Sequence, residues 1–191
     1  MLIRKLFKYE ASHQVFDAYS RRCSHSVHGH SYIVEFIFEG RVPDNAHMVI
    51  DFGFIKKFFH PFVDAFDHSH MLMGDGFNPP TKAVKFFKEN NERWVSLPFN
   101  STAEMQAKMF YVYGMFALRE LRKRECINES VRMHSVKVHE TDTGYAEFRD
   151  MDYHSCQFLK VNLKDIIFST GTTDDWSEEF TKFYHDVIKN S

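Results

Sequence analysis

The chain has 191 residues, and its 24 Lys and Arg against 26 Asp and Glu give a formal net charge of −2 at neutral pH. This length fits one domain with a single buried core, and 43% hydrophobic with 26% charged residues excludes a disordered chain. The balanced charge predicts no nucleic-acid partner. No apolar run approaches the roughly 20 residues that span a membrane, so no membrane association is expected. The 12 histidines favour metal or proton chemistry, and the 21 phenylalanines predict an aromatic core.

The cysteines favour a reducing compartment. Cys23, Cys126 and Cys156 are an odd number at scattered spacings, which does not fit a disulfide framework. The first 13 residues are charged and alternating, without the apolar segment of a signal peptide. We therefore expect a cytoplasmic protein.

Alternating and helical patterns divide the first part of the chain. Residues 2–16 and 30–39 alternate between apolar and polar positions, which predicts two strands. From Phe54 the apolar residues recur every three or four positions, which predicts a helix that closes at Asp67 and His68. Residues 74–100 are polar and contain proline, with a short helix expected at 81–90.

The second part begins with a strong helix start. Ser101-Thr-Ala-Glu104 has the form of a capping box, in which Ser101 caps the amide of Glu104, and the helix that it opens should run to about Arg124. The pattern then predicts a hairpin from residues 131–140 and 144–152, a strand at 158–168 and an amphipathic helix at 173–189. Because strands and helices do not alternate regularly, the order favours an α+β fold whose antiparallel sheet has helices on one face.

The strongest chemical signal is His28-Gly-His30 at the start of the second strand. Residues two apart on a strand project from the same face, so both imidazoles point the same way. His13, at the end of the first strand, would lie beside them if the two strands pair. Three histidines suit zinc and leave a position open for substrate. Two surface histidines in a His-rich chain are the alternative interpretation, since short motifs are weak evidence.

Two further features carry less weight alone. Asp67-His68 can form an oriented acid–base pair, because the carboxylate fixes the imidazole tautomer. The alternative is a histidine placed favourably at a helix C-terminus. Glu140, at the end of a strand, could accept two parallel hydrogen bonds from a ligand, or be an ordinary strand-end glutamate.

Taken in chain order, these pieces resemble the family of 6-pyruvoyltetrahydropterin and 6-carboxytetrahydropterin synthases. The resemblance covers about residues 3–150 of a single domain spanning 1–191. It leaves residues 74–100 as an insertion between the two helices and residues 151–191 as a C-terminal extension. The matching segments are Phe7–His13, Cys23 with His28-Gly-His30, Met48–Phe52, Asp67-His68, Ser101–Glu104 and Val138–Thr141.

The resemblance implies a fold and an assembly. The fold would be the tunnelling fold, or T-fold, with a four-stranded antiparallel sheet and two helices on one face. Such chains assemble as trimers or as dimers of trimers. The amphipathic extension would then pack against its own domain or against a neighbouring subunit.

The resemblance also implies roles for particular residues. His13, His28 and His30 would bind zinc. The catalytic groups would be Cys23, Asp67 and His68. The pterin substrate would be bound by Glu140, Thr102 and Glu104.

The two branches of the family share the substrate 7,8-dihydroneopterin triphosphate. The carboxy branch releases acetaldehyde and triphosphate to leave 6-carboxytetrahydropterin, a precursor of queuosine, whereas the pyruvoyl branch eliminates triphosphate and rearranges the side chain. Ile50-Asp51-Phe52, and Pro61 six residues before Asp67, favour the carboxy branch. The pyruvoyl reaction and a non-catalytic pterin-binding relative are the alternatives. The four residues between Cys23 and His28 depart from the spacing of both branches, so Ser24 or His25 could occupy the thiol position.

Overall fold

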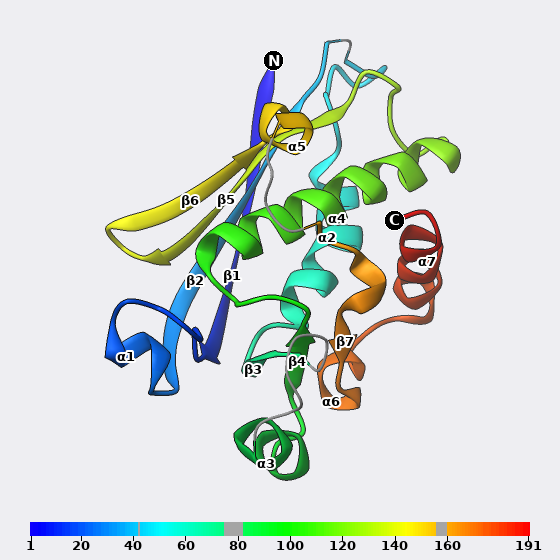
Figure 1. Ribbon diagram of the computed structural model, residues 1–191. Helices are drawn as coiled ribbons and strands as arrows, with labels where there is room; N and C mark the ends of the chain where they lie inside the picture. Colours follow the sequence, from blue (N-terminus) through cyan, green and yellow to red (C-terminus); the bar gives the residue numbers. More distant parts are fainter. Residues whose placement is uncertain (42, 75–81, 156–159) are drawn as a thin grey trace.

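A computed structural model describes residues 1–41, 43–74, 82–155 and 160–191. In this part of the chain the strands form one mixed sheet in the order β6-β5-β2-β1-β3-β4-β7. The longer helices pack against one face of the sheet (Figure 1). The α+β T-fold predicted from the sequence is confirmed, with a difference in the number of strands.

The antiparallel half of the sheet contains the four strands that the alternating pattern predicts. They are β1 (Leu2–His13), β2 (His28–Glu39), β5 (Arg132–Thr141) and β6 (Gly144–Arg149). β1 and β2 pair over their whole length, from Leu2 opposite Glu39 to His13 opposite His28. Because successive side chains on a strand point to opposite faces, alternate residues of both strands are buried beneath the helices.

Three short strands extend the sheet beyond the expected four. β3 (Ser69–Met73) runs parallel to the end of β1, β4 (Trp94–Leu97) runs parallel to β3, and β7 (Ile167–Phe168) pairs antiparallel with β4. β3 is almost entirely buried, so it has no alternating pattern to reveal it. The expected strand at 158–168 is wrong except for β7. Residues 163–165 form the short 3-10 helix η1 (Leu163–Asp165), and residues 158 and 159 lie outside the described part.

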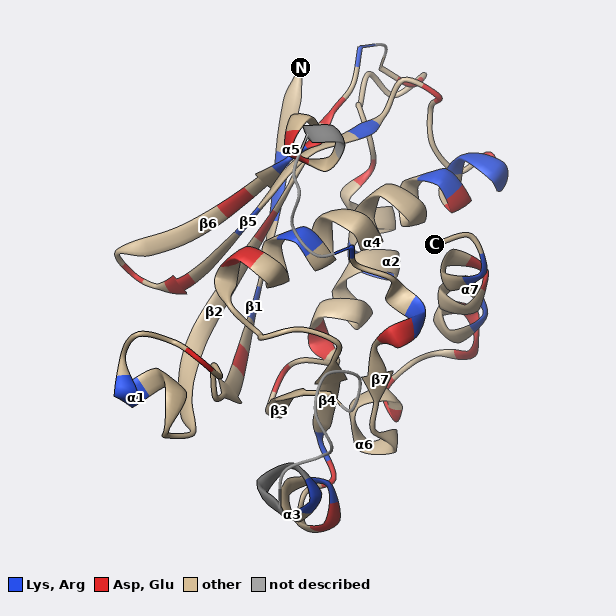
Figure 2. Cartoon of the chain, in the orientation of Figure 1, with Lys and Arg blue, Asp and Glu red and all other residues tan. Residues whose placement is uncertain are grey.

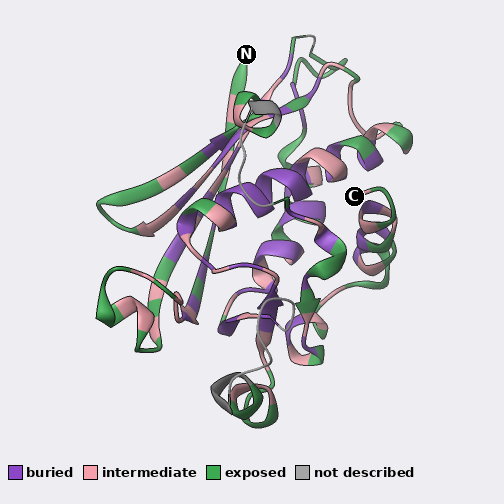
Figure 3. Ribbon diagram, in the orientation of Figure 1, coloured by how far each residue is buried: buried purple, intermediate pink, exposed green. Residues whose placement is uncertain are grey.

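Two helices cover the buried face of the sheet. α2 (Phe52–Asp64) starts at Asp51, whose carboxylate accepts a hydrogen bond from Gly53 N at 2.6 Å, and α4 (Ala103–Lys123) is the long helix expected from the sequence. Their contact with the sheet is aromatic: the Phe59 ring meets Phe36 edge-on, with ring centres 5.2 Å apart. Figure 3 shows the buried residues gathered between α2, α4 and the strands. Each fully buried Phe stabilises the fold by about 2–3 kcal/mol relative to an exposed one.

The C-terminal extension packs on its own chain, which is the first of the two expected arrangements. α7 (Glu178–Lys189) begins at Ser177, which caps Phe180 N. Its apolar side chains contact α2 and α4, with Phe183 4.4 Å from Phe58 between ring centres. The remaining helices are short: α1 (Arg21–Ser24), α3 (Lys82–Asn90), α5 (Asp150–Ser155) and α6 (Thr170–Thr173). α3 agrees with the helix expected at 81–90, apart from Thr81, which is not described. None of the helices in the described ranges has the length and apolar character needed to cross a membrane.

Candidate metal and substrate site

Strand pairing brings three histidines together at the end of β1 and the start of β2. His13 lies opposite His28, and Ala11 lies opposite His30. All three imidazoles therefore lie on the face of the sheet that also carries the buried side chains of β1 and β2. His13 Nε2 is 3.1 Å from His28 Nε2. One ring nitrogen from each of the three histidines lies within 4.8 Å of the others. The juxtaposition expected from the parity of the two strands is therefore found in the structure.

Backbone carbonyls fix the tautomers of two of these rings. His13 Nδ1 is 3.0 Å from Ser101 O, and His28 Nδ1 is 3.0 Å from Ser26 O. A carbonyl oxygen only accepts hydrogen bonds, so each Nδ1 carries the proton and each Nε2 presents a lone pair. The two Nε2 lone pairs face each other at 3.1 Å, so a cation bound between them could accept both.

Burial favours the neutral form of two of the imidazoles, those of His13 and His30. His13 is completely buried, and desolvation lowers its pKa from 6.5 to about 4 against the opposing effect of the Ser101 carbonyl. Burial also lowers the pKa of His30, and the nearby Glu140 carboxylate opposes that shift. Neutral imidazoles with converging lone pairs are the donor set of a His₃ metal site, in which one position stays open. These residues therefore fit a zinc ion.

A cavity of about 440 Å³ opens beside the three histidines. Its walls contain the expected thiol and all three expected pterin-binding residues, namely Cys23, Thr102, Glu104 and Glu140. Glu140 Oε1 lies 3.6 Å from His13 Nε2 and 3.9 Å from His30 Nε2, so the carboxylate points toward the metal ligands from the end of β5. The start of the β5–β6 hairpin also lines the cavity, through Thr141, Gly144, Tyr145 and Ala146.

Backbone hydrogen bonds hold the segment that carries Cys23. Val15 N donates to Cys23 O at 3.0 Å, and Gln14 Nε2 donates to Ser24 O at 2.6 Å. α1 is thereby tied to the residues that follow β1. Figure 2 shows basic residues on α1 and an acidic residue in the first turn of α4, and both helices contribute residues to the lining of the cavity.

Asp67 and His68 form the expected pair, but away from this cavity. Asp67 Oδ2 is 2.7 Å from His68 Nδ1, and Asp67 Oδ1 accepts a hydrogen bond from Glu10 N at 2.6 Å. Both residues follow α2, which ends at Asp64, rather than closing that helix. His68 has a φ of +53°, so the chain turns sharply before β3.

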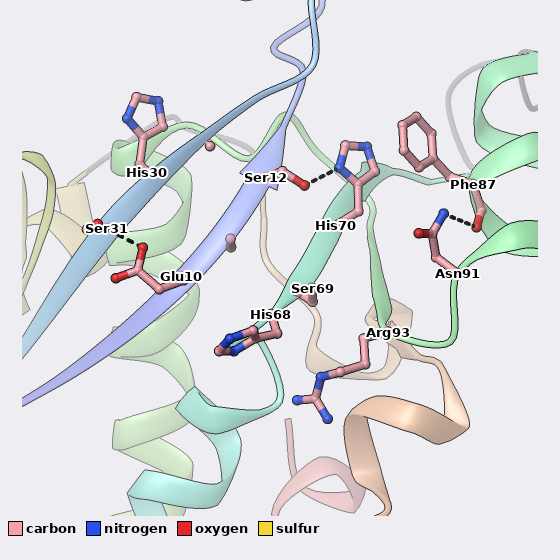
Figure 4. Close-up of a pocket in the computed structure, with 12 residues that line it drawn as sticks. Glu10, Ser12, His30, Ser31, His68, Ser69, His70, Phe87, Asn91 and Arg93 are labelled. Atoms are coloured by element: carbon pink, nitrogen blue, oxygen red, sulfur yellow. Dashed lines mark hydrogen bonds between the residues drawn. The ribbon is translucent and has the colours of Figure 1, made fainter.

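The pair lies on the side of the sheet to which Glu10, Ser12 and Ser31 point. His68 lines a second cavity of about 410 Å³, together with the outward-facing Glu10, Ser12 and Ser31. In Figure 4 the His68 ring lies apart from the His30 ring, with β1 between them. His30 also lines this second cavity, but neither Asp67 nor His68 lines the cavity that contains Cys23 and Glu140.

Sequence reasoning misjudged one residue at the start of α4. Thr102, not Ser101, is the N-cap, and its hydroxyl accepts a hydrogen bond from Met105 N at 3.3 Å. Ser101 instead places both its carbonyl and its hydroxyl beside His13 Nδ1, at 3.0 and 3.1 Å. The capping pattern located the helix start correctly to within one residue, but nothing in it indicated a contact with the metal ligand.

Comparisons with known proteins find one family and several relatives that this chain resembles. The family model described as 6-pyruvoyl tetrahydropterin synthase matches residues 2–151. A protein of Helicobacter pylori strain J99 named 6-carboxy-5,6,7,8-tetrahydropterin synthase is 35% identical over the whole chain and 92% of its own length. A protein of the same name from Aquifex aeolicus is 28% identical over 78% of this chain and 97% of its own.

Solved structures share the fold. An uncharacterized protein from Wolinella succinogenes superposes with a TM-score of 0.55 at 19% identity, covering 78% of this chain and 98% of that one. The 6-pyruvoyl tetrahydropterin synthase of Plasmodium vivax gives the same TM-score and identity, covering 78% of this chain and 97% of the other.

Proposed function

The chain belongs to the 6-pyruvoyl tetrahydropterin synthase family, and we propose that it is a zinc-dependent 6-carboxy-5,6,7,8-tetrahydropterin synthase. It converts 7,8-dihydroneopterin triphosphate to 6-carboxytetrahydropterin, with release of acetaldehyde and triphosphate, as a step of queuosine biosynthesis. The observation that carries the proposal is the convergence of three imidazoles, a thiol and Glu140 on one cavity. The full-length similarity to relatives of that name favours the carboxy branch.

His13, His28 and His30 hold the metal in this proposal. Zinc bound there supplies a Lewis acid that polarises the hydroxyl groups of the substrate side chain. Burial favours the neutral form of His13 and His30, and backbone carbonyls orient His13 and His28. Fixed tautomers of this kind reduce the reorganisation needed when the substrate arrives.

Cys23 acts as the base that removes a carbon-bound proton from the substrate. Its side chain lines the cavity together with His28 and His30, so it is near the metal ligands without belonging to the metal-ligand cluster. Arg21 and Arg22 precede it in α1, and neither has a carboxylate partner within the ranges that the structure describes. The thiolate is the form of a cysteine that accepts a proton.

Glu140 holds the pterin ring. A pterin offers a ring N–H and an exocyclic amino group side by side, and a carboxylate accepts both as parallel hydrogen bonds. Thr102 and Glu104 complete the wall of this pocket at the start of α4. Because Glu140 also points toward His13 and His30, a ring bound to it presents its side chain to the metal. Such positioning supplies a large part of the rate.

The Asp67–His68 pair requires a second copy of the chain to take part. Neither Asp67 nor His68 lines the cavity that contains Cys23 and Glu140, so in this proposal the pair shuttles protons for a neighbouring subunit. The sheet offers edges for such an assembly. Within the described residues, β6 pairs only with β5, and β1 from Leu2 to Glu10 pairs only with β2. Unpaired edges invite pairing with another chain, which supports a trimer or a dimer of trimers.

A mixing experiment tests this arrangement. Cys23→Ala and His68→Ala chains are each expected to lose most activity, and co-assembled mixtures should regain part of it, because some cavities then receive an intact thiol and an intact pair. Mixtures as inactive as the parents would contradict a shared site. Sedimentation analysis of the same samples reports whether the mutants assemble like the wild type.

Two alternatives remain distinguishable by products. The pyruvoyl branch would release triphosphate without acetaldehyde, and a non-catalytic relative would bind a pterin and release neither. The spacing between Cys23 and His28 is the feature that favours the non-catalytic alternative. Incubation with 7,8-dihydroneopterin triphosphate, followed by assays for triphosphate and acetaldehyde, separates all three.

A further inference from the structure

A chain of buried hydrogen bonds runs from the core of the protein to His13. The Tyr9 hydroxyl donates to Gln106 Oε1, and Gln106 Nε2 donates to Ser101 O at 2.8 Å. The same carbonyl oxygen accepts the Nδ1–H of His13 at 3.0 Å. All four residues are at most 2% exposed. Three separate elements, β1, α4 and the segment before α4, therefore meet in one polar network that is closed to water.

The direction of each hydrogen bond in the network is fixed. The Ser101 carbonyl can only accept, so the Gln106 NH₂ group must face it and Gln106 Oε1 must face the Tyr9 hydroxyl. Ser101 itself lies just outside α4, which starts at Ala103, so the regular hydrogen bonds of the helix do not hold its carbonyl. Gln106 is the helical residue that fastens this carbonyl in place.

We propose that Gln106, oriented by Tyr9, is a positioning residue for the metal site. By holding the Ser101 carbonyl, it fixes the tautomer and the ring direction of His13 and so sets the affinity of the three histidines for zinc. This inference rests on the proposed metal site and adds residues that do not touch the metal. Loss of outer-shell partners of a ligating histidine typically weakens metal binding by about 10- to 100-fold.

The chain contains a matched control for the removal of a buried hydroxyl. Tyr113 is also completely buried, and its hydroxyl donates to Phe58 O without any contact with His13. Tyr9→Phe and Tyr113→Phe each delete one buried hydrogen bond, and only the first belongs to the network. Gln106→Met removes both amide hydrogen bonds while keeping a side chain of similar length. Ser101→Ala keeps the carbonyl and removes only the hydroxyl.

The measurement is the zinc dissociation constant of the purified full chain, obtained by competition with a chromophoric chelator. We expect zinc to bind about 10-fold or more weakly to Gln106→Met, several-fold more weakly to Tyr9→Phe, and within about twofold of wild type to Tyr113→Phe and Ser101→Ala. The cobalt(II) absorption of each variant should keep its tetrahedral intensity, because the three ligands are unchanged. The midpoint temperature of thermal unfolding of the metal-free protein should fall in both tyrosine variants. Because only Tyr9→Phe should also weaken zinc binding, the two measurements separate stability from metal affinity.

Two results would overturn the inference. One is a Gln106→Met protein that binds zinc as tightly as wild type. The other is an equal loss of affinity in Tyr9→Phe and Tyr113→Phe, which would assign the effect to general destabilisation. If Gln106→Met does not fold, the comparison of the two tyrosine variants decides. A wild type that binds no zinc would instead refute the metal site itself, and the proposed function with it.

Discussion

Replacing Glu140 with Gln tests the pterin pocket with a change of a single atom. Glu140 stands at the end of β5, its Oε1 atom lies 3.6 Å from His13 Nε2, and its side chain is 33% exposed to the cavity. Glutamine keeps the shape of the side chain, but it offers one acceptor and one donor where a pterin requires two acceptors. The Gln NH₂ group would face an N–H group of the ring, so one hydrogen bond is replaced by a clash of donors.

The expected loss follows from the chemistry of the contact. A charge-assisted, bidentate hydrogen bond that becomes shielded from water contributes roughly 2–4 kcal/mol, which corresponds to about 30- to 1000-fold in affinity. The stoichiometry of zinc should not change, because the three imidazoles are untouched. A matched control is Glu147→Gln on β6, where the carboxylate pairs with Lys137 at 3.9 Å and does not line the cavity.

Calorimetric titration with a non-reacting pterin measures the effect, alongside elemental analysis for zinc. We expect weak or undetectable binding to Glu140→Gln, wild-type binding to Glu147→Gln, and about one zinc per chain in both. Equal affinity of wild type and Glu140→Gln for the pterin would refute the pocket, and with it the synthase assignment. Loss of zinc from Glu140→Gln would show that the carboxylate serves the metal rather than the ring.

Three further predictions concern other residues. His28→Ala should lose most of its zinc and activity, because two imidazoles do not hold the ion; elemental analysis that finds full metal in this variant would contradict the site. Cys23→Ala should keep zinc and fold but lose most turnover, whereas Cys126→Ala should behave as wild type; unchanged activity of Cys23→Ala would move the proton transfer to another group. Burial lowers the pKa of His70 from 6.5 to about 4, so unfolded chains take up a proton in this range that folded chains do not, and stability falls as the pH falls. Between about pH 7 and pH 5 proton uptake at His70 accounts for a loss of about 2 kcal/mol, so denaturant titrations should find a loss smaller by that amount in His70→Gln than in wild type; identical pH dependence of the two proteins would contradict it.

The sequence predicted the antiparallel half of the sheet and the long helices because their patterns are long. β1 and β2 alternate over twelve residues each, and α4 keeps a helical period over 21. The same alternation placed His13, His28 and His30 on one face, so the metal cluster could be derived from parity alone. β3 and β4 have five and four residues and are mostly buried. A short strand that is buried on both faces has no alternation of apolar and polar residues, so it can be recognised only from the strands that pair with it.

The placement of Asp67 and His68 shows a different limit. The two residues are adjacent, so the sequence predicts their hydrogen bond. Which face of the sheet they serve depends on where the chain passes between α2 and β3, and this is decided by tertiary packing. Ser101 illustrates the same point, because its contact with His13 joins residues 88 positions apart. Local patterns identified these residues but could not locate them relative to the metal ligands.

The central claim is that this chain is a 6-carboxy-5,6,7,8-tetrahydropterin synthase, and product analysis tests it most directly. Zinc-loaded protein incubated with 7,8-dihydroneopterin triphosphate should release acetaldehyde and triphosphate in equal amounts, together with 6-carboxytetrahydropterin. Zinc-loaded Cys23→Ala should release far less of all three. Triphosphate without acetaldehyde would place the protein in the pyruvoyl branch, and a pterin bound without any product would contradict the enzymatic assignment.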